Sequence, residues 1–223
     1  MIEQSRTLLN QELSDLTTNI LRLTSMVDHA LEKAMEALYS RDLELAQKVI
    51  VGDEEINNLR FDIEQGCLLI LATQQPFAID LRTVITAMHL ATELERIGDH
   101  ASGIAKLVER MEGEEEIESL HKLPKMAKRA RKMIQESIQA YVDRDAEMAE
   151  SMVSRDDKLD KQYHLLFSET VREMSDDDYI RRATYLLWVG HNLERIGDRA
   201  TNIAERVIFM TKGEFVENIG SQD

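Results

Sequence analysis

Apolar residues recur in two long segments of the chain at alternating steps of three and four. This spacing puts them on one face of an α-helix, as in the seam of a coiled coil. The seam positions are Ala87, Leu90, Leu94, Ile97, Ala101, Ile104 and Val108 in the first segment, and Leu186, Val189, Leu193, Ile196, Ala200, Ile203 and Val207 in the second. The pattern predicts two long helices that cross their neighbours at about 20°.

The two segments also share a sequence. The hexapeptide Leu-Glu-Arg-Ile-Gly-Asp occupies residues 94–99 and recurs at residues 193–198. Upstream, the pair Arg-Asp occurs at residues 41–42 and again at residues 144–145. The sequence therefore predicts an internal duplication, with one domain over residues 1–112 and a second over residues 113–223. Between them lies a run of acidic residues with one glycine, a composition typical of a solvated linker.

Turn signals divide each half into three helices. They lie near residues 39–42 and 73–76 in the first half and near residues 143–145 and 175–178 in the second. We expect the third helix of the first half to begin at Pro76, because proline is favoured in the first helical turn. With 9 glycines and 2 prolines, the chain has few residues for strand turns. The predicted fold class is all-α: two tandem homologous three-helix bundles, with six long helices and approximate two-fold symmetry.

The net charge of the chain limits the classes of partner that it can bind. There are 27 lysines and arginines against 42 acidic residues, a net charge of −15. This balance argues against binding to nucleic acid or directly to an anionic membrane, since both attract cationic surfaces. Cys67 is the single cysteine, so it forms neither an intrachain disulfide nor a thiolate zinc site by itself. The N-terminus has no signal-peptide pattern, and we expect a cytoplasmic protein.

Two pairs of acids stand out within the repeated hexapeptide. Glu95 and Asp99, like Glu194 and Asp198, are four residues apart and therefore stack on one helical face. Like charges at this spacing destabilise a helix by a few tenths of a kcal/mol, roughly. Gly98 and Gly197 lie beside them, and we expect these glycines to allow close packing of a neighbouring helix.

A second group of side chains is predicted to face these pairs. If the second and third helices of each half are antiparallel, Asp53 and Asn57 lie level with the first pair, and Asp156 and Asp160 with the second. Converging oxygen ligands suit hard or borderline divalent cations such as magnesium, manganese and iron. The alternative is that these are ordinary solvated faces of an acidic protein.

Six basic residues cluster at the start of the fourth predicted helix: Lys122, Lys125, Lys128, Arg129, Arg131 and Lys132. We favour their pairing with acidic groups elsewhere in the chain over an anion-binding or partner-binding patch. A ferritin-like di-iron site needs two Glu-x-x-His motifs on core helices. Residues 118–121 supply the only such motif, and it lies in the junction.

The duplicated three-helix unit, with the hexapeptide in each third helix and the sequence Pro-Phe-Ala-Ile-Asp-Leu-Arg at residues 76–82, resembles the PhoU family. The resemblance extends from about residue 8 to about residue 210. It implies two PhoU three-helix bundles side by side, usually in a homodimer. It also implies a cytoplasmic regulator of phosphate homeostasis. When phosphate is plentiful, such a protein acts with the ATPase subunit of the phosphate ABC transporter and with a sensor histidine kinase. Together they restrain uptake and keep the phosphate-starvation regulon off.

The resemblance further implies metal ions bound to Glu/Asp-x-x-x-Asp motifs, of the types iron, zinc, magnesium or manganese. The residues that match these motifs are Glu95 and Asp99 in the first half, and Asp156, Asp160, Glu194 and Asp198 in the second. Asn57 departs from the motif, so we expect the first-half site to be weaker. Two other functions stay open at this point: a metal-dependent helical enzyme, and a structural bundle without metal.

Overall fold

The protein is described by a computed structural model that covers residues 2–114, 122–153, 157–173 and 177–214. Within these ranges the chain forms seven helices: α1 (Ile2–Ser40), α2 (Leu43–Gln74), α3 (Ile79–Arg110), α4 (Leu123–Asp143), α5 (Ala146–Val153), α6 (Asp157–Glu173) and α7 (Asp177–Lys212). Helices α5 and α6 occupy the place of the second predicted helix of the second half. Residues 154–156, between them, lie outside the described ranges.

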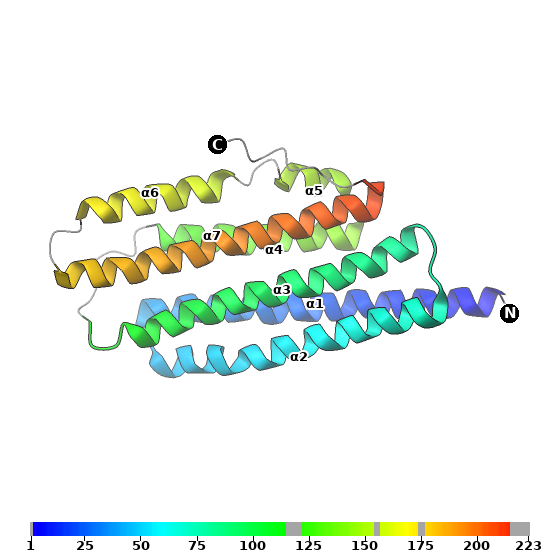
Figure 1. Ribbon diagram of the computed structural model, residues 1–223, viewed down its shortest axis with the longest axis horizontal. Helices are drawn as coiled ribbons and strands as arrows, with labels where there is room; N and C mark the ends of the chain where they lie inside the picture. Colours follow the sequence, from blue (N-terminus) through cyan, green and yellow to red (C-terminus); the bar gives the residue numbers. More distant parts are fainter. Residues whose placement is uncertain (1, 115–121, 154–156, 174–176, 215–223) are drawn as a thin grey trace.

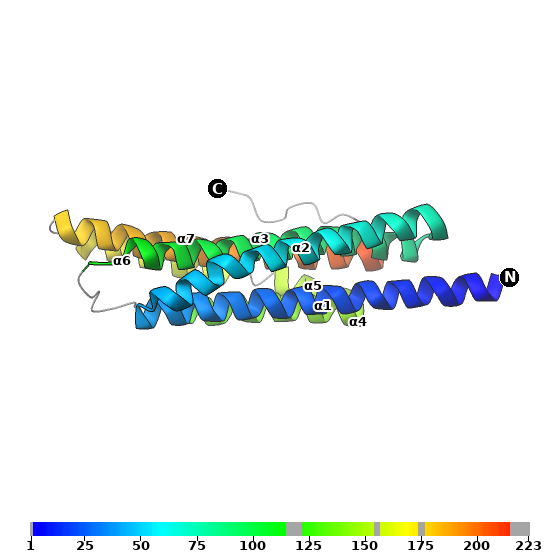
Figure 2. The same cartoon turned by 90° about the horizontal axis from the view of Figure 1, so that it is seen from below.

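Each half packs as a bundle around its own third helix. Helices α1, α2 and α3 contact one another, while α4, α5 and α6 all contact α7. The halves meet where α3 lies beside α7 and α1 beside α4 (Figure 1). Seen from below, α1 and α4 form one layer, α3, α7 and α6 form the other, and α2 crosses from the first layer to the second (Figure 2). The predicted all-α fold with duplicated bundles is confirmed.

The repeated Arg-Asp pair has the same structural role in both halves. Arg41 and Arg144 both have a φ of 54°, the left-handed conformation that ends a helix. The next residue then caps the following helix: Asp42 accepts a hydrogen bond from the backbone N–H of Leu45 at 2.9 Å, and Asp145 accepts one from Met148 at 2.9 Å. This sequence signal therefore marks a helix boundary at matched positions.

One prediction about a helix start was wrong. Helix α3 begins at Ile79 and not at Pro76. Gln75 and Ala78 have positive φ values of 47° and 49°, so the chain turns over this stretch before it becomes helical. The backbone N–H of Asp80 donates to the carbonyl of Phe77 at 3.0 Å as the helix begins.

A continuous apolar core runs through both halves. All fourteen predicted seam residues are buried, with at most 4% of their surface exposed. Helices α3 and α7 contact each other through equivalent positions of the two halves. Glu93 of α3 corresponds to Asn192 of α7, and His100 of α3 corresponds to Arg199 of α7, each 99 residues further along. Glu93 accepts a hydrogen bond from Arg199 at 3.3 Å, and His100 Nδ1 lies 3.0 Å from Asn192 Oδ1. No helix in the described part of the chain has the length and hydropathy needed to span a membrane.

The two motif glycines lie at close helix contacts. A Cβ atom on Gly98 would be 3.1 Å from Ile56 Cγ2 of α2, and one on Gly197 would be 2.5 Å from Leu159 Cδ2 of α6. Real Cβ contacts are rarely as short as 3.1 Å, and 2.5 Å is a clash. The prediction that these glycines allow close packing is confirmed, and in each half they let the second helix approach the acidic pairs.

Candidate metal centre

Three carboxylates of the second half converge between α6 and α7. Asp160 on α6 and Glu194 and Asp198 on α7 each place a ligand atom within 4.8 Å of the other two, and all three are partly buried. Among the described residues this is the one group of three potential ligands that lies so close together. The predicted juxtaposition of these three residues across the second and third helices is confirmed. Asp156, the fourth predicted residue, lies outside the described residues.

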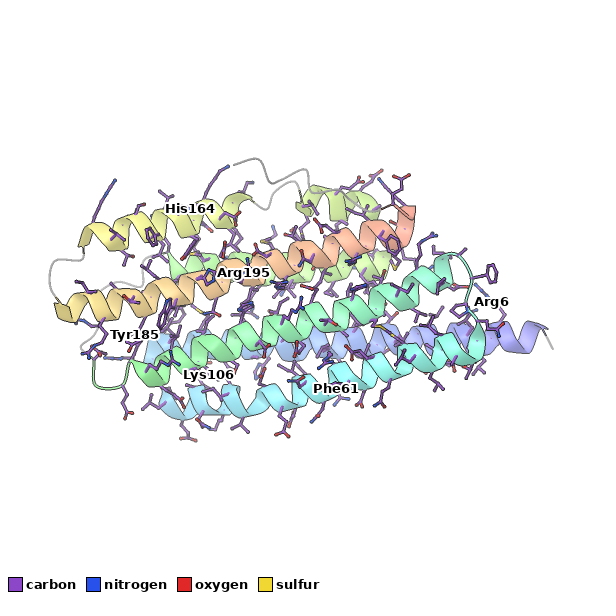
Figure 3. All side chains as sticks on the ribbon, in the orientation of Figure 1. Arg6, Phe61, Lys106, His164, Tyr185 and Arg195 are labelled. Carbon is purple, nitrogen blue, oxygen red and sulfur yellow. The ribbon has the colours of Figure 1, made fainter. Side chains whose placement is uncertain are left out.

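The cluster is electrostatically strained. Burial and the nearby charges of Glu194 and Asp160 raise the pKa of Asp198 to about 6, although Arg195 and Arg199 act in the opposite direction. Arg195 lies near the middle of α7, where its guanidinium donates to Asp198 at 2.7 Å (Figure 3). A bound cation would favour the charged form of all three carboxylates.

One oxygen of the cluster lacks a hydrogen bond. Glu194 Oε2 is buried and accepts none, although His191 Nδ1 lies 3.2 Å away. The imidazole forms an ion pair with this oxygen only when it is protonated, so with a neutral imidazole the buried oxygen is a place where a cation fits. The donor set consists of oxygens, which are the ligands that magnesium, manganese and iron accept.

The first half carries a related but different arrangement. Burial and the charge of Asp99 raise the pKa of Asp53 and also that of Glu95, so the three carboxylates lie near one another as predicted. Asn57, the fourth predicted residue, accepts a hydrogen bond at its Oδ1 from Arg60 Nη2 at 3.2 Å.

Cations within the first half partly neutralise its acids. Arg60 lowers the pKa of Glu95, and Lys106 lowers that of Asp53, each against the larger effect of burial. The duplicated positions in the second half are Tyr163 and Glu205. Internal positive charge therefore approaches the first cluster from positions that carry none in the second. The second cluster has Arg195 and Arg199 beside it instead, so the halves differ in where their cations lie, and an alignment of the two halves would have revealed this difference from the sequence.

Comparison with known proteins agrees with the duplicated geometry. The family model for the PhoU domain matches the chain twice, over residues 20–108 and 123–207. This chain belongs to the PhoU family. Each match contains one Glu-x-x-x-Asp pair on the third helix of a PhoU repeat.

Full-length relatives carry the same family name. The chain is 35% identical over 215 residues to the phosphate-specific transport system accessory protein PhoU homolog of Clostridium acetobutylicum, a match that covers 96% of this chain and 98% of the relative. It is 36% identical over 213 residues to the homolog of Pseudomonas aeruginosa, over 95% and 88% of the two chains.

Solved PhoU structures have the same fold. The crystal structure of the phosphate transport system regulatory protein PhoU from Streptococcus pneumoniae matches with a TM-score of 0.87 at 34% identity, over 94% of this chain and 99% of that one. PhoU from Pseudomonas aeruginosa matches with a TM-score of 0.85 at 36% identity, over 92% and 99%.

Proposed function

We propose that this chain is a cytoplasmic, non-enzymatic regulator of phosphate homeostasis. In this role it restrains phosphate uptake and keeps the phosphate-starvation regulon off when phosphate is plentiful. The observation that carries the proposal is the family match, which spans both repeats and nearly the whole length of relatives named as accessory or regulatory proteins of phosphate transport. Its partners in this role are the ATPase subunit of the phosphate ABC transporter, a phosphate-sensing histidine kinase and a second copy of the chain.

The carboxylates supply the metal-binding part of the proposal. Asp160, Glu194 and Asp198 would hold a divalent or trivalent cation, and Asp156 is a further proposed ligand. Support comes from the three converging ligand atoms and from Glu194 Oε2, which is buried and accepts no hydrogen bond. Iron, zinc, magnesium and manganese remain candidates, and the oxygen donors favour the harder ions over zinc. Asp53, Glu95 and Asp99 form the proposed weaker site of the first half. This site has one negative charge fewer, because Asn57 stands where the second half has Asp160.

A cation in this position would connect two helices. Asp160 comes from α6, whereas Glu194 and Asp198 come from α7. Bound metal would relieve the repulsion that raises the pKa of Asp198 and would hold α6 on α7. The metal-loaded face would thereby offer partners a less negative and more rigid surface.

A genetic experiment tests the regulatory role. Phosphate uptake and alkaline phosphatase expression are measured at high phosphate in a deletion strain, with the intact gene restored as the control. We expect deletion to raise both quantities and restoration to return them to the starting level. Unchanged expression in the deletion strain would contradict the proposal. Phosphate-dependent co-precipitation with the transporter ATPase subunit tests the adaptor role separately.

Metal analysis tests the site with matched variants. The purified protein is exposed to manganese or iron, desalted and analysed by elemental mass spectrometry, alongside Glu194→Gln and Glu95→Gln. The two substitutions fall at duplicated positions and remove the same charge. We expect Glu194→Gln to remove most of the bound metal and Glu95→Gln to remove less. Equal metal content in the wild type and Glu194→Gln would refute the second-half site.

The same variants distinguish the two other functions. A metal-dependent enzyme would show turnover that follows metal occupancy and is lost in Glu194→Gln. A structural bundle without metal would keep or gain stability in both variants, because each removes repulsion and no ligand is lost.

A further inference from the structure

The basic cluster at the start of α4 is only partly neutralised. Lys122 pairs with Glu169, Arg131 with Asp28 at 2.7 Å and with Glu32 at 2.9 Å, and Lys132 with Glu136 at 3.5 Å. For these three cations the expected pairing with acidic groups is confirmed. The other three members of the cluster form no hydrogen bond or ion pair with any residue in the described ranges: Lys125, Lys128 and Arg129. For them the expectation was wrong.

These three side chains line one hollow. It has a volume of about 310 Å³ and lies between α4, α5 and α6. Lys132 and Lys158 complete its rim, and the buried side chains of Met133 and Met152 supply apolar surface. Glu136 is the one acidic residue among the described residues that line it. We call it the α4 hollow. Within the described part of the chain, five cations and one acid line it, although the net charge of the chain is −15.

The first half shows that packing alone does not require these charges. A hollow of about 350 Å³ lies between α1 and α2, at the position that the duplication relates to the α4 hollow. Its lining includes Met26, His29 and Glu55. The equivalent residues of the α4 hollow, each 103 residues later, are the cations Arg129, Lys132 and Lys158. The two lysines of the first hollow are both paired, Lys33 with Glu36 at 2.7 Å and Lys48 with Glu44 at 2.7 Å. The hollow is thus a product of the fold, whereas its unpaired cations belong to the second half alone.

We propose that the α4 hollow binds a small anion that carries two or more phosphoryl groups. Lysine ammonium groups are compact point charges that bind phosphate oxygens well. The cations extend along α4 from Lys125 to Lys132, a distance of about 10 Å along the helix axis. Orthophosphate is too small to contact all of them, whereas a chain of linked phosphoryl groups is long enough.

Two further features of the hollow agree with a small polyanion. Its volume is near the lower end of small-molecule sites, which begin at about 300 Å³. Lys125 lies in the first turn of α4, where Pro124 occupies one of the first two helical positions and no side chain caps the helix, so the positive end of the helix dipole adds to the field.

The α4 hollow adjoins the proposed metal site, although Asp160, Glu194 and Asp198 are not among the residues that line it. Met133 lines the hollow, and its Cε would be 3.6 Å from a Cβ on Gly197, which lies between Glu194 and Asp198 on α7. The carboxylates attract cations and the hollow attracts anions. The proposal for the hollow does not rest on the regulatory function, and because the two sites adjoin, it is tested on metal-free protein.

Calorimetric titration of the full chain tests the proposal. Metal is stripped first, and the chelator is then removed by dialysis, because a chelator is itself a polyanion. Inorganic tripolyphosphate is titrated in about 0.1 M salt, where weak surface attraction is largely screened. We expect one tripolyphosphate per chain and affinity at least about tenfold weaker for orthophosphate and sulfate.

Matched double variants locate the site. Lys125→Gln with Lys128→Gln removes two charges from the α4 hollow, and Lys33→Gln with Lys48→Gln removes two from the related hollow of the first half. We expect the first variant to weaken tripolyphosphate binding at least about tenfold and the second to leave it within about twofold. Far-UV circular dichroism checks that both are folded, and Arg129→Gln alone provides a second, milder test.

Several results would overturn the proposal. One is that the wild type binds no tripolyphosphate, and another is that the two double variants lose affinity for tripolyphosphate equally. Tighter binding of a polyglutamate peptide than of tripolyphosphate would also contradict the site. ATP distinguishes the sources of the phosphoryl groups. Affinity equal to that of tripolyphosphate shows that the phosphoryl groups alone are recognised, and tighter binding identifies a nucleotide; both results support the site. Failure of the deletion-strain experiment would leave this binding result unchanged.

Discussion

Asp198 carries a charge that the fold disfavours. Burial and the adjacent Glu194 raise its pKa from 3.8 to about 6. Between about pH 4 and pH 6 the folded protein therefore binds more protons at this group than the unfolded chain does. It follows that the stability of the metal-free protein decreases as the pH rises through this window and stays lower above it.

The substitution Asp198→Asn tests this effect. In metal-free protein at about pH 7.5 we expect it to raise the free energy of unfolding by about 1 to 2 kcal/mol, a value reduced for screening because the side chain is 29% exposed. The gain should largely disappear at about pH 4.5, where the wild-type carboxyl is protonated. Thermal denaturation at the two pH values measures the difference. Destabilisation at the higher pH would mean that the ion pair with Arg195 outweighs the repulsion.

Glycines in the helices provide a second test at single residues. A Cβ on Gly197 would lie 2.5 Å from Leu159 Cδ2, whereas a Cβ on Gly52 of α2 would have no atom within 4 Å. We expect Gly197→Ala to lower the free energy of unfolding by about 1 to 3 kcal/mol through overpacking. Gly52→Ala should raise it by up to about 1 kcal/mol through helix propensity. Urea denaturation measures both, and similar values for the two variants would contradict the close contact of α6 and α7.

Helices α3 and α7 join the halves through a polar contact beside their apolar seams. Glu93 is central to it, since it accepts hydrogen bonds from Arg96 at 3.0 Å, Arg199 at 3.3 Å and Asn202 at 3.1 Å. The side chains of Glu93 and Arg199 are only 13% and 18% exposed. Their contact is therefore screened less than a surface ion pair.

We expect Glu93→Ala to lower the free energy of unfolding by about 1 to 3 kcal/mol, because it leaves Arg199 partly buried without this partner. Arg96→Ala is the control. Arg96 is 50% exposed, so its loss should change stability by about 0.5 kcal/mol or less. Chemical denaturation of both variants makes the comparison, and an equal effect would show that Glu93 serves only its own helix.

The arrangement of the elements could largely be predicted from the sequence. The three-four periodicity identified the seam residues, and antiparallel pairing placed Asp53 near Glu95, because helix geometry fixes both relations. The hydrogen bond from Arg60 to Asn57 could not be predicted, since it depends on a side-chain rotamer. The start of α3 was also misplaced: proline is compatible with a first helical turn, but the positive φ of Ala78 is a property of the folded loop.

The whole molecule has one apolar core shared by two duplicated halves. Helices α3 and α7 belong to different halves and pack directly on each other. Trp188, the single tryptophan, lies on α7 and reports on the second half, whereas far-UV circular dichroism reports on all helices. We expect urea unfolding followed by the two signals to give coincident transitions. A tryptophan transition at lower urea than the circular dichroism transition would contradict a single cooperative unit.

Which basic side chains form ion pairs on the surface could not be predicted from the sequence. Net charge and the basic cluster were visible in the sequence, and pairing within an acidic protein was the simpler interpretation. The structure pairs Arg131 with Asp28 and Glu32 of α1 but leaves Lys125 and Lys128 around a hollow without an ion pair in the described part of the chain.

The position of α6 has a consequence for motion. It contacts only α7 and α4 among the described helices, so we expect it to open locally more readily than α1, α2 or α3, although its Leu159 and Leu166 belong to the apolar core. Ligands from α6 and α7 bind a cation together only while α6 is closed. Bound cation would therefore slow amide hydrogen exchange in α6 in proportion to metal concentration, while exchange in α1 and α2 stays nearly constant. The cluster would thus make the frequency of local opening of α6 depend on the concentration of a metal ion.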